Sequence, residues 1–125
     1  MTQRPILVVE DDENLALLIA QLLRREGYVC TVLRNGAQAC ALARRLQPAL
    51  LLLDFMMPAG GGAAVHRELR QAEDTRALPV LIVTAAPEEH VHRAIDMDGR
   101  TYYLAKPYAR AELLELVKRI LEDVD

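Results

Sequence analysis

Four consecutive leucines, Leu50 to Leu53, are followed at once by a carboxylate, Asp54. An unbroken apolar run of this length, closed by Pro58 and the glycines at 60–62, is typical of a strand buried on both faces of a parallel sheet. Asp54 is then expected at the carboxyl end of that strand. Because ligands of open parallel sheets bind beyond those ends, Asp54 is a candidate site residue. The alternative is that it only opens the following turn, as aspartate often does.

Length and charge narrow the classes of protein that remain. The chain has 125 residues, enough for one domain with a proper core, so residues 1–125 are expected to form one domain. We expect a soluble, cytoplasmic protein, because no run could cross a bilayer and no basic-then-apolar leader opens the chain. A formal net charge of -3 argues against nucleic-acid binding. Cys30 and Cys40 form no redox or disulfide-rich pattern and are expected to be reduced packing residues.

Four further apolar runs predict strands at residues 6–9, 28–33, 79–83 and 101–104. Helical periodicity follows every strand, with helices expected from Asn14 to a stop at Gly27, at 39–46, around 65–69, at 88–97 and at 109–123. This alternation predicts an α/β fold with a doubly wound parallel sheet, helices on both faces and every strand exit on one rim.

Polar side chains stand where these strands end. They are Glu10 and Asp11 after the first strand, Asp54 after the third, Thr84 after the fourth and Lys106 after the fifth. Acids near a helix start can also serve as caps. If the first and third strands are neighbours, however, their carboxylates converge, and two of them about 5 Å apart repel by roughly 3 kcal/mol at an effective dielectric near 20. We therefore expect a hard cation, Mg²⁺, at this rim, with the Lys106 amine as a second positive charge.

A carboxylate beside Mg²⁺ and an amine is suited to phosphoryl transfer, in which positioning and charge neutralisation supply most of the catalysis. Aspartate can itself be the nucleophile and become an aspartyl phosphate. The Thr84 hydroxyl could then hydrogen-bond to the new phosphoryl oxygens and transmit the change to a loop. The residues alone thus indicate a phosphate-operated switch.

The same residues resemble the receiver domain of two-component response regulators. The segment Ile6 to Glu13, ILVVEDDE, is similar to that family's first strand and acidic pocket, and Asp54 to Pro58 with Gly62 is similar to its phosphoacceptor loop. Thr84-Ala85 and Tyr103 to Tyr108 resemble its switch hydroxyl, switch aromatic and lysine-proline turn. The resemblance spans nearly the whole chain and implies a (βα)5, flavodoxin-like sheet in the strand order 2-1-3-4-5. Residues 100–102, Arg-Thr-Tyr, depart from the family's small and acidic residues.

Carried over residue by residue, the resemblance implies that Asp54 takes a phosphoryl group from a phosphohistidine on a histidine kinase or phosphotransfer protein. Mg²⁺ would be held directly by Asp11 and Asp54 and through water by Glu10. The backbone carbonyl of Met56 would be the remaining protein ligand.

The resemblance also implies a way in which the signal leaves the site. Lys106 would pair with the phosphoryl oxygens, Thr84 would move toward them and Tyr103 would swing inward. The Lys106-Pro107 bond would be cis. The fourth helix, fifth strand and fifth helix would form the surface for a downstream protein or a second copy of the chain.

This reading makes the chain a signalling phosphoacceptor that catalyses only its own phosphorylation and dephosphorylation. The alternative is a non-phosphorylated docking or dimerisation module on the same fold. A small phosphatase or flavin protein is disfavoured because Met56 stands where a second aspartate would be needed, and acids stand where a phosphate-binding glycine loop would be needed.

Several side chains have simpler expected roles. His66 is expected to be a solvated side chain on a short helix, and His90 and His92 point apart on a helix, so they are expected to be exposed and not to share a metal. Met57 is expected to pack inward. Tyr102 is expected to follow ordinary strand alternation, with a surface role on the output face as the alternative.

Overall fold

A computed structural model describes residues 4–57 and 61–123 of the chain. Strands and helices alternate along it, with a short 3-10 helix, η1, before the second helix. The elements are β1 (Ile6–Val9), α1 (Glu13–Arg25), β2 (Cys30–Leu33), η1 (Gly36–Gln38), α2 (Ala39–Leu46), β3 (Leu50–Leu53), α3 (Gly61–Gln71), β4 (Val80–Thr84), α4 (Glu88–Ala94), β5 (Thr101–Ala105) and α5 (Arg110–Asp123).

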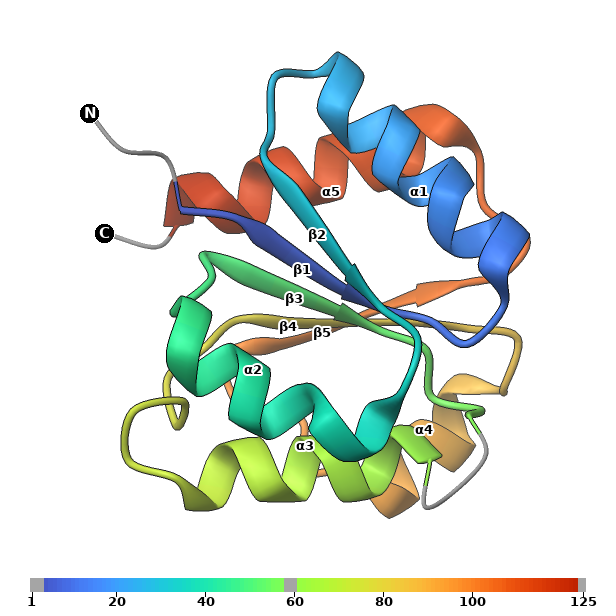
Figure 1. Ribbon diagram of the computed structural model, residues 1–125. Helices are drawn as coiled ribbons and strands as arrows, with labels where there is room; N and C mark the ends of the chain where they lie inside the picture. The colour runs from blue at the N-terminus through green and yellow to red at the C-terminus, as the bar shows by residue number, and fades with distance from the viewer. Residues whose placement is uncertain (1–3, 58–60, 124–125) are drawn as a thin grey trace.

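The five strands form one parallel sheet in the order β2-β1-β3-β4-β5. Figure 1 shows α1 and α5 on one face of the sheet and α2, α3 and α4 on the other. The expected doubly wound fold and its strand order are therefore confirmed. Because β1 pairs with both β2 and β3, the direction of winding reverses at β1 and β3, which is where open α/β sheets bind their ligands.

The β3 leucines explain how one strand holds both layers together. All four are at most 2% exposed. Leu51 and Leu53 belong to the core cluster under α2, α3 and α4, whereas Leu50 and Leu52 belong to the cluster under α1 and α5. A strand with polar residues on alternate positions could not serve two apolar layers, so the unbroken leucine run is a direct consequence of its central place.

Two helix ends and one helix cap differ from the expectations. The third helix begins at Gly61, so part of the expected glycine loop is helical. The fourth helix ends at Ala94 instead of near Met97, because residues 95–100 lead in a non-helical path to β5. Helix α5 has a cap that its Ala109 does not predict: the Glu112 carboxylate accepts a hydrogen bond of 2.7 Å from the Ala109 N–H. Pro58 and Gly60 lie outside the described residues.

His66 corrects one expectation outright. It is only 3% exposed, and its Nε2 lies 2.9 Å from the Thr101 hydroxyl oxygen. The surface expectation failed because α3 packs the His66 side of the helix against the start of β5. Its polar ring is tolerated there because the hydrogen bond to Thr101 compensates for the contact with water that the ring loses on burial.

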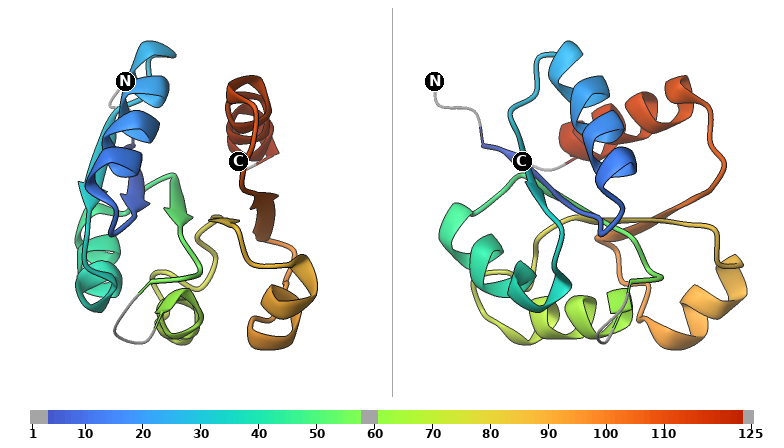
Figure 2. Two further views of the ribbon diagram at one scale, coloured as in Figure 1. Left: turned by 90° about the vertical axis from the view of Figure 1, so that its right-hand side faces the viewer. Right: turned by 45° about the vertical axis from the view of Figure 1, so that its right-hand side comes forward.

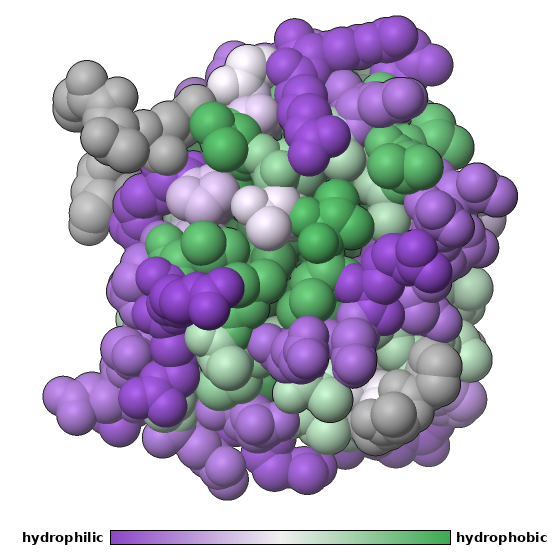
Figure 3. All heavy atoms as spheres, in the orientation of Figure 1, coloured by the Kyte–Doolittle hydropathy of each residue, from purple (hydrophilic) through white to green (hydrophobic). Residues whose placement is uncertain are grey.

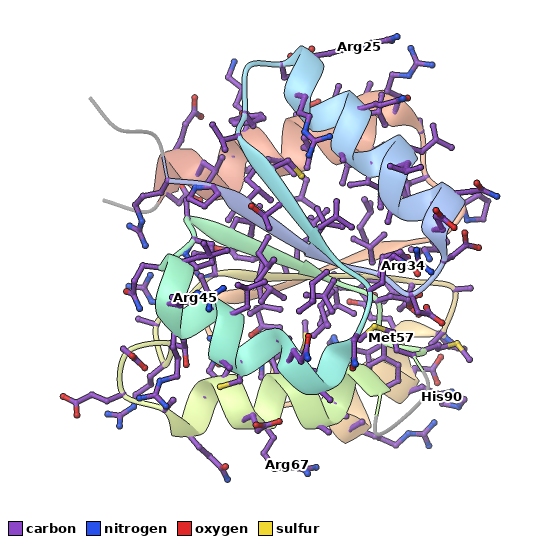
Figure 4. The ribbon with its side chains drawn as sticks, in the orientation of Figure 1. Arg25, Arg34, Arg45, Met57, Arg67 and His90 are labelled. Carbon is purple, nitrogen blue, oxygen red and sulfur yellow. The ribbon has the colours of Figure 1, made fainter. Side chains whose placement is uncertain are left out.

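Other side chains lie as expected. Met57 points into the core and His90 projects outward from α4 (Figure 4). Tyr102 is half-buried and packs against the cluster under α5, as strand alternation requires, and both cysteines are free. Strand β2 is one edge of the sheet, and Figure 3 views the molecule from the side of that edge. A band of apolar atoms crosses the middle of this view. None of the helices in the described ranges is long and apolar enough to span a membrane.

Candidate functional site

The expected acidic cluster forms at the carboxyl ends of β1 and β3. Val9 and Leu53 are register partners, so the residues that follow them, Glu10 and Asp54, leave the sheet side by side. Their backbones are anchored by hydrogen bonds from Asp54 N to the Val9 carbonyl and from Glu10 N to the Leu33 carbonyl, at 3.2 and 3.0 Å. Asp11 completes the cluster.

Carboxylate oxygens of Glu10, Asp11 and Asp54 lie within 4.8 Å of one another. This is the separation at which oxygen ligands can share one small cation, and all donors in the cluster are the hard oxygens that Mg²⁺ prefers. The residues present thus fit the expected ion. The backbone carbonyl of Met56 stays a predicted ligand.

Lys106 reaches the same cluster from the end of β5. Its Nζ lies 3.2 Å from Glu10 Oε1 and 3.4 Å from Asp54 Oδ2. The side chains of Glu10, Asp54 and Lys106 are 4%, 11% and 21% exposed, so water reaches the aspartate and the amine more than it reaches the glutamate. The expected convergence of residues from three separate strand ends is therefore present in the structure.

The protonation of this cluster reflects its burial. Burial raises the pKa of Glu10 to about 7, and the negative charge of Asp54 also raises it. The hydrogen bond from the Asp12 N–H and the positive charge of Lys106 act in the opposite direction and lower this pKa. Burial lowers the pKa of Lys106, but Asp54 and Glu10 more than compensate, so the pKa is raised and the amine stays charged. Negative charge is thus held close together and only partly neutralised by one amine, as expected of a cation site.

The loop after Asp54 fixes the orientation of that carboxylate. Asp54 Oδ1 accepts a hydrogen bond of 3.0 Å from the Met56 N–H, and the Met56 side chain is 63% exposed. Gly62 then packs against the loop: a Cβ at this position would lie 2.7 Å from the Phe55 Cα and 2.9 Å from the Asp54 carbonyl oxygen. The glycine is therefore required for the loop to close over α3.

Thr84 and Tyr103 occupy the neighbouring strands β4 and β5. Thr84 is fully buried, and its Oγ1 accepts a hydrogen bond of 3.2 Å from the Ala86 N–H. Tyr103 already points inward, and its hydroxyl donates to the Ala86 carbonyl at 2.8 Å. The Lys106-Pro107 bond is cis, as the resemblance implied. Sequence reasoning did not find Ala86, because a backbone contact leaves no signature in the identity of the residue.

Comparisons with known proteins agree with this geometry. Residues 6–118 match the family described as response regulator receiver domain, so the chain belongs to that family. It is 37% identical over 117 residues to the transcriptional regulatory protein BaeR of Escherichia coli O6:H1, covering 93% of this chain and 47% of BaeR. It is 32% identical to the polar-differentiation response regulator DivK of Brucella anthropi, covering 96% of this chain and 98% of DivK. The chain thus spans about half the length of BaeR and nearly all of DivK.

A solved structure gives the same picture. The receiver domain of the sensor histidine kinase PA1611 from Pseudomonas aeruginosa superimposes with a TM-score of 0.86 at 32% identity, covering 97% of this chain and 99% of that one. That structure is described as having a magnesium ion coordinated in its active-site cleft. The chain is accordingly a receiver domain of two-component signalling.

Proposed function

We propose that this receiver domain accepts a phosphoryl group on Asp54 in a Mg²⁺-dependent reaction. One observation carries the proposal: three carboxylates from two strand ends and the Lys106 amine from a third meet at one partly accessible place. The donor is a phosphohistidine on a histidine kinase or phosphotransfer protein. The N–P bond to the donor imidazole breaks as a bond forms between phosphorus and an Asp54 carboxylate oxygen.

The residues of the chain divide the work. Asp54 is the nucleophile, held in place by the Met56 N–H. Asp11, Asp54 and the Met56 carbonyl would hold Mg²⁺ directly and Glu10 through water. The bound ion would neutralise charge on the transferring oxygens. Lys106 lies 3.4 Å from Asp54 Oδ2 and is placed to pair with a phosphoryl oxygen once the aspartate is modified.

Phosphorylation then acts on Thr84 and Tyr103. A new phosphoryl oxygen can accept the Thr84 O–H proton and draw that side chain toward it, which alters the bond that Thr84 Oγ1 accepts from the Ala86 N–H. A shift of Ala86 then moves the carbonyl to which the Tyr103 hydroxyl donates. These shifts change the surface formed by α4, β5 and α5. Because β5 is an edge strand with no partner beyond it in the described sheet, this surface is open to a downstream protein or a second copy.

In this proposal residues 1–125 form one phosphoacceptor domain that acts on no separate substrate. The domain is cytoplasmic, and its two free cysteines fit that location. A docking module that is never phosphorylated is not favoured, since it would gain nothing from crowding acids around a lysine. Keeping such charges buried costs free energy that an apolar rim would not.

The test is covalent labelling with a small phosphodonor, acetyl phosphate, followed by intact-mass measurement. The wild type is expected to gain the mass of one phosphoryl group with Mg²⁺ and none with EDTA. Asp54→Asn should gain none under either condition. Asp12→Asn is the matched control, because Asp12 lies beside the cluster but caps α1 through the Leu15 N–H, a role that asparagine can keep.

Labelling of Asp54→Asn at the wild-type level would contradict the proposal. The association state, followed by light scattering during the same reaction, tests the output surface. Phosphorylation should change self-association or partner binding, and a variant in Tyr103 should reduce that change without reducing labelling.

A further inference from the structure

A hollow of about 960 Å³ lies at the opposite rim of the sheet from the acidic site. Its walls include Pro79 and Arg100, which stand just before β4 and β5, whereas Asp54 and Lys106 follow their strands. Because all strands run parallel, the two places lie at opposite ends of the sheet. The volume is at the upper end of the range of roughly 300–1,000 Å³ for small-molecule pockets. It is far larger than a bare ion needs.

The hollow lies beside the C-terminal end of α4. It is lined by α3, by the loop between α3 and β4, and by the non-helical segment that runs from Ile95 to β5. The left view of Figure 2 shows α3, in green, and α4, in orange, on the same side of the sheet. A fourth helix that continued to Met97 would place another turn beside this space. The early end at Ala94 leaves the space open instead.

One arginine gives the hollow a fixed floor. The Arg70 guanidinium donates to the Leu78 carbonyl at 2.7 Å, to Asp98 Oδ2 at 2.8 Å and to the Thr101 hydroxyl at 3.1 Å. These bonds join α3 to the two loops that bound the hollow. A site whose walls are already bonded together loses little conformational freedom when a ligand binds.

Three other arginines supply positive charge that no ion pair within the described residues neutralises. Arg67, Arg76 and Arg100 line the hollow from its three different walls, and all are exposed. Figure 4 shows Arg67 projecting outward from α3. Within residues 4–57 and 61–123, none of the three forms an ion pair, although the chain as a whole is acidic. Guanidinium groups bind phosphate oxygens in a two-pronged geometry, so this set favours a phosphorylated ligand.

The remaining lining describes the other half of that ligand. Pro79 and Ile95 line the hollow but are buried, so the half-buried ring of Tyr102 is the aromatic surface against which a flat ring can pack. The carboxylates of Asp96 and Asp123 also line the hollow and can accept hydrogen bonds from amino or hydroxyl groups. Phosphate-binding cations, a wall for a ring and acceptors for its polar edge are the recognition elements of a nucleotide.

We propose that this hollow is a binding site for a nucleotide, separate from the phosphoacceptor site. Its phosphates bind Arg67, Arg76 and Arg100, and its ring packs against Tyr102. A ligand held there bridges α3 to the segment that enters β5, the strand that carries Tyr103.

The test uses the full chain, ADP as the probe and EDTA to remove divalent cations, so that ADP cannot be bridged to the acidic rim. Calorimetry should give saturable binding, and amide NMR shifts should cluster around Arg67 and Arg100. The double variant Arg67→Ala and Arg100→Ala should weaken binding by about tenfold or more, as expected on loss of hydrogen bonds between charged groups. Arg76→Ala alone should weaken it less.

The matched control removes two exposed arginines outside the hollow, Arg25→Ala with Arg45→Ala, and should change the affinity by less than about twofold, as expected for screened surface charges. Equal losses in both pairs would overturn the proposal, because diffuse charge would then explain the binding. So would the absence of binding at millimolar ADP, shifts confined to Glu10 and Asp54, or inorganic phosphate binding as tightly as ADP. If an RNA oligonucleotide bound more tightly than ADP, the proposal of a mononucleotide ligand would also be overturned, and the ligand would be a nucleic acid.

Discussion

Thr84 and Tyr103, on the adjacent strands β4 and β5, are hydrogen-bonded to the two ends of the same residue. The Ala86 N–H donates to Thr84 Oγ1 at 3.2 Å, and the Ala86 carbonyl accepts from the Tyr103 hydroxyl at 2.8 Å. The backbone of Ala86 therefore joins the Thr84 hydroxyl at the end of β4 to the Tyr103 ring on β5. A displacement of either side chain changes the bond made by the other.

This link predicts an energetic coupling between the two residues. Tyr103→Phe and Thr84→Val should each lower the free energy of unfolding by about 0.5–1.5 kcal/mol, the usual net value of one hydrogen bond. The double variant should lose less than the sum, because once Ala86 is released by one change the second removes less. Urea unfolding of the four proteins measures this.

Tyr102→Phe is the control for loss of a tyrosine hydroxyl, since the Tyr102 hydroxyl makes no hydrogen bond within the residues that the structure describes. It should cost less than Tyr103→Phe. Additive effects of Tyr103→Phe and Thr84→Val would mean that Ala86 does not couple the two.

The acidic cluster predicts opposite effects of Asp11→Asn with and without metal. In EDTA the variant should be more stable than the wild type, by up to about 1 kcal/mol, because one of three crowded charges is gone. Saturating Mg²⁺ at about 100 times its dissociation constant should stabilise the wild type by about 2.7 kcal/mol and the variant far less. Thermal unfolding in both buffers measures the two effects.

Asp12→Asn should behave as the wild type does in both buffers, because Asp12 caps α1 and is not part of the cluster. If Mg²⁺ stabilised Asp11→Asn as much as the wild type, Asp11 would not be a ligand.

Gly62→Ala should displace the loop that carries Asp54. The added methyl group would overlap the Phe55 Cα and the Asp54 carbonyl, and backbone atoms cannot move aside as a flexible side chain can. Overpacking of this kind costs about 1–3 kcal/mol. Gly99→Ala is the matched change, because nothing lies within 4 Å of a Cβ there, and it should stay within about 0.5 kcal/mol of the wild type.

Chemical denaturation gives the stabilities, and acetyl phosphate labelling should be slower in Gly62→Ala alone. Equal labelling rates in the two alanine variants would show that the contact does not position Asp54.

The sequence was sufficient for the sheet and for the acidic rim because both depend on residues whose roles are set locally. Leu50 to Leu53 can be satisfied only between two apolar layers, and the residue after such a strand must emerge at its carboxyl end. Once β1 and β3 are neighbours, Glu10 and Asp54 have to meet. The convergence of these residues needed no information beyond the strand pattern and the order that the family resemblance implied.

His66 and the end of α4 could not be predicted in the same way. Whether a histidine on a helix is buried depends on what the opposing element offers, and here the partner, Thr101, is 35 residues away in the sequence. The apolar spacing in the fourth helix was weak, and the segment after it is held by the hydrogen bonds that Asp98 makes to Arg70 and to the Arg100 N–H. Such contacts between distant segments override local helix propensity.

The buried His66 predicts a pH dependence of stability. The Thr101 hydroxyl donates its proton to Asp98 Oδ1 at 2.8 Å, so its oxygen accepts from His66 Nε2–H, and in the neutral ring the proton is on Nε2. Burial lowers the pKa of His66, and the neighbouring Arg70 lowers it further, while Asp98 and Asp96 oppose this shift. The pKa in the folded protein thus lies below the ordinary value of 6.5.

At His66 the unfolded chain therefore binds more protons than the folded protein as the pH falls through about 6.5, so the contribution of this residue to stability decreases with falling pH. The raised pKa of Glu10 acts in the opposite direction, and the comparison with a His66 variant separates the two. His66→Gln keeps a donor for Thr101 but cannot be protonated. Its stability relative to the wild type should be lowest at pH 7 and above and should rise steadily as the pH falls from 6.5 toward 5. Urea unfolding across this range measures it, with His90→Gln, on the exposed face of α4, reporting what a surface histidine contributes. A difference between wild type and His66→Gln that stays constant with pH would mean that the ring is not held neutral by its surroundings.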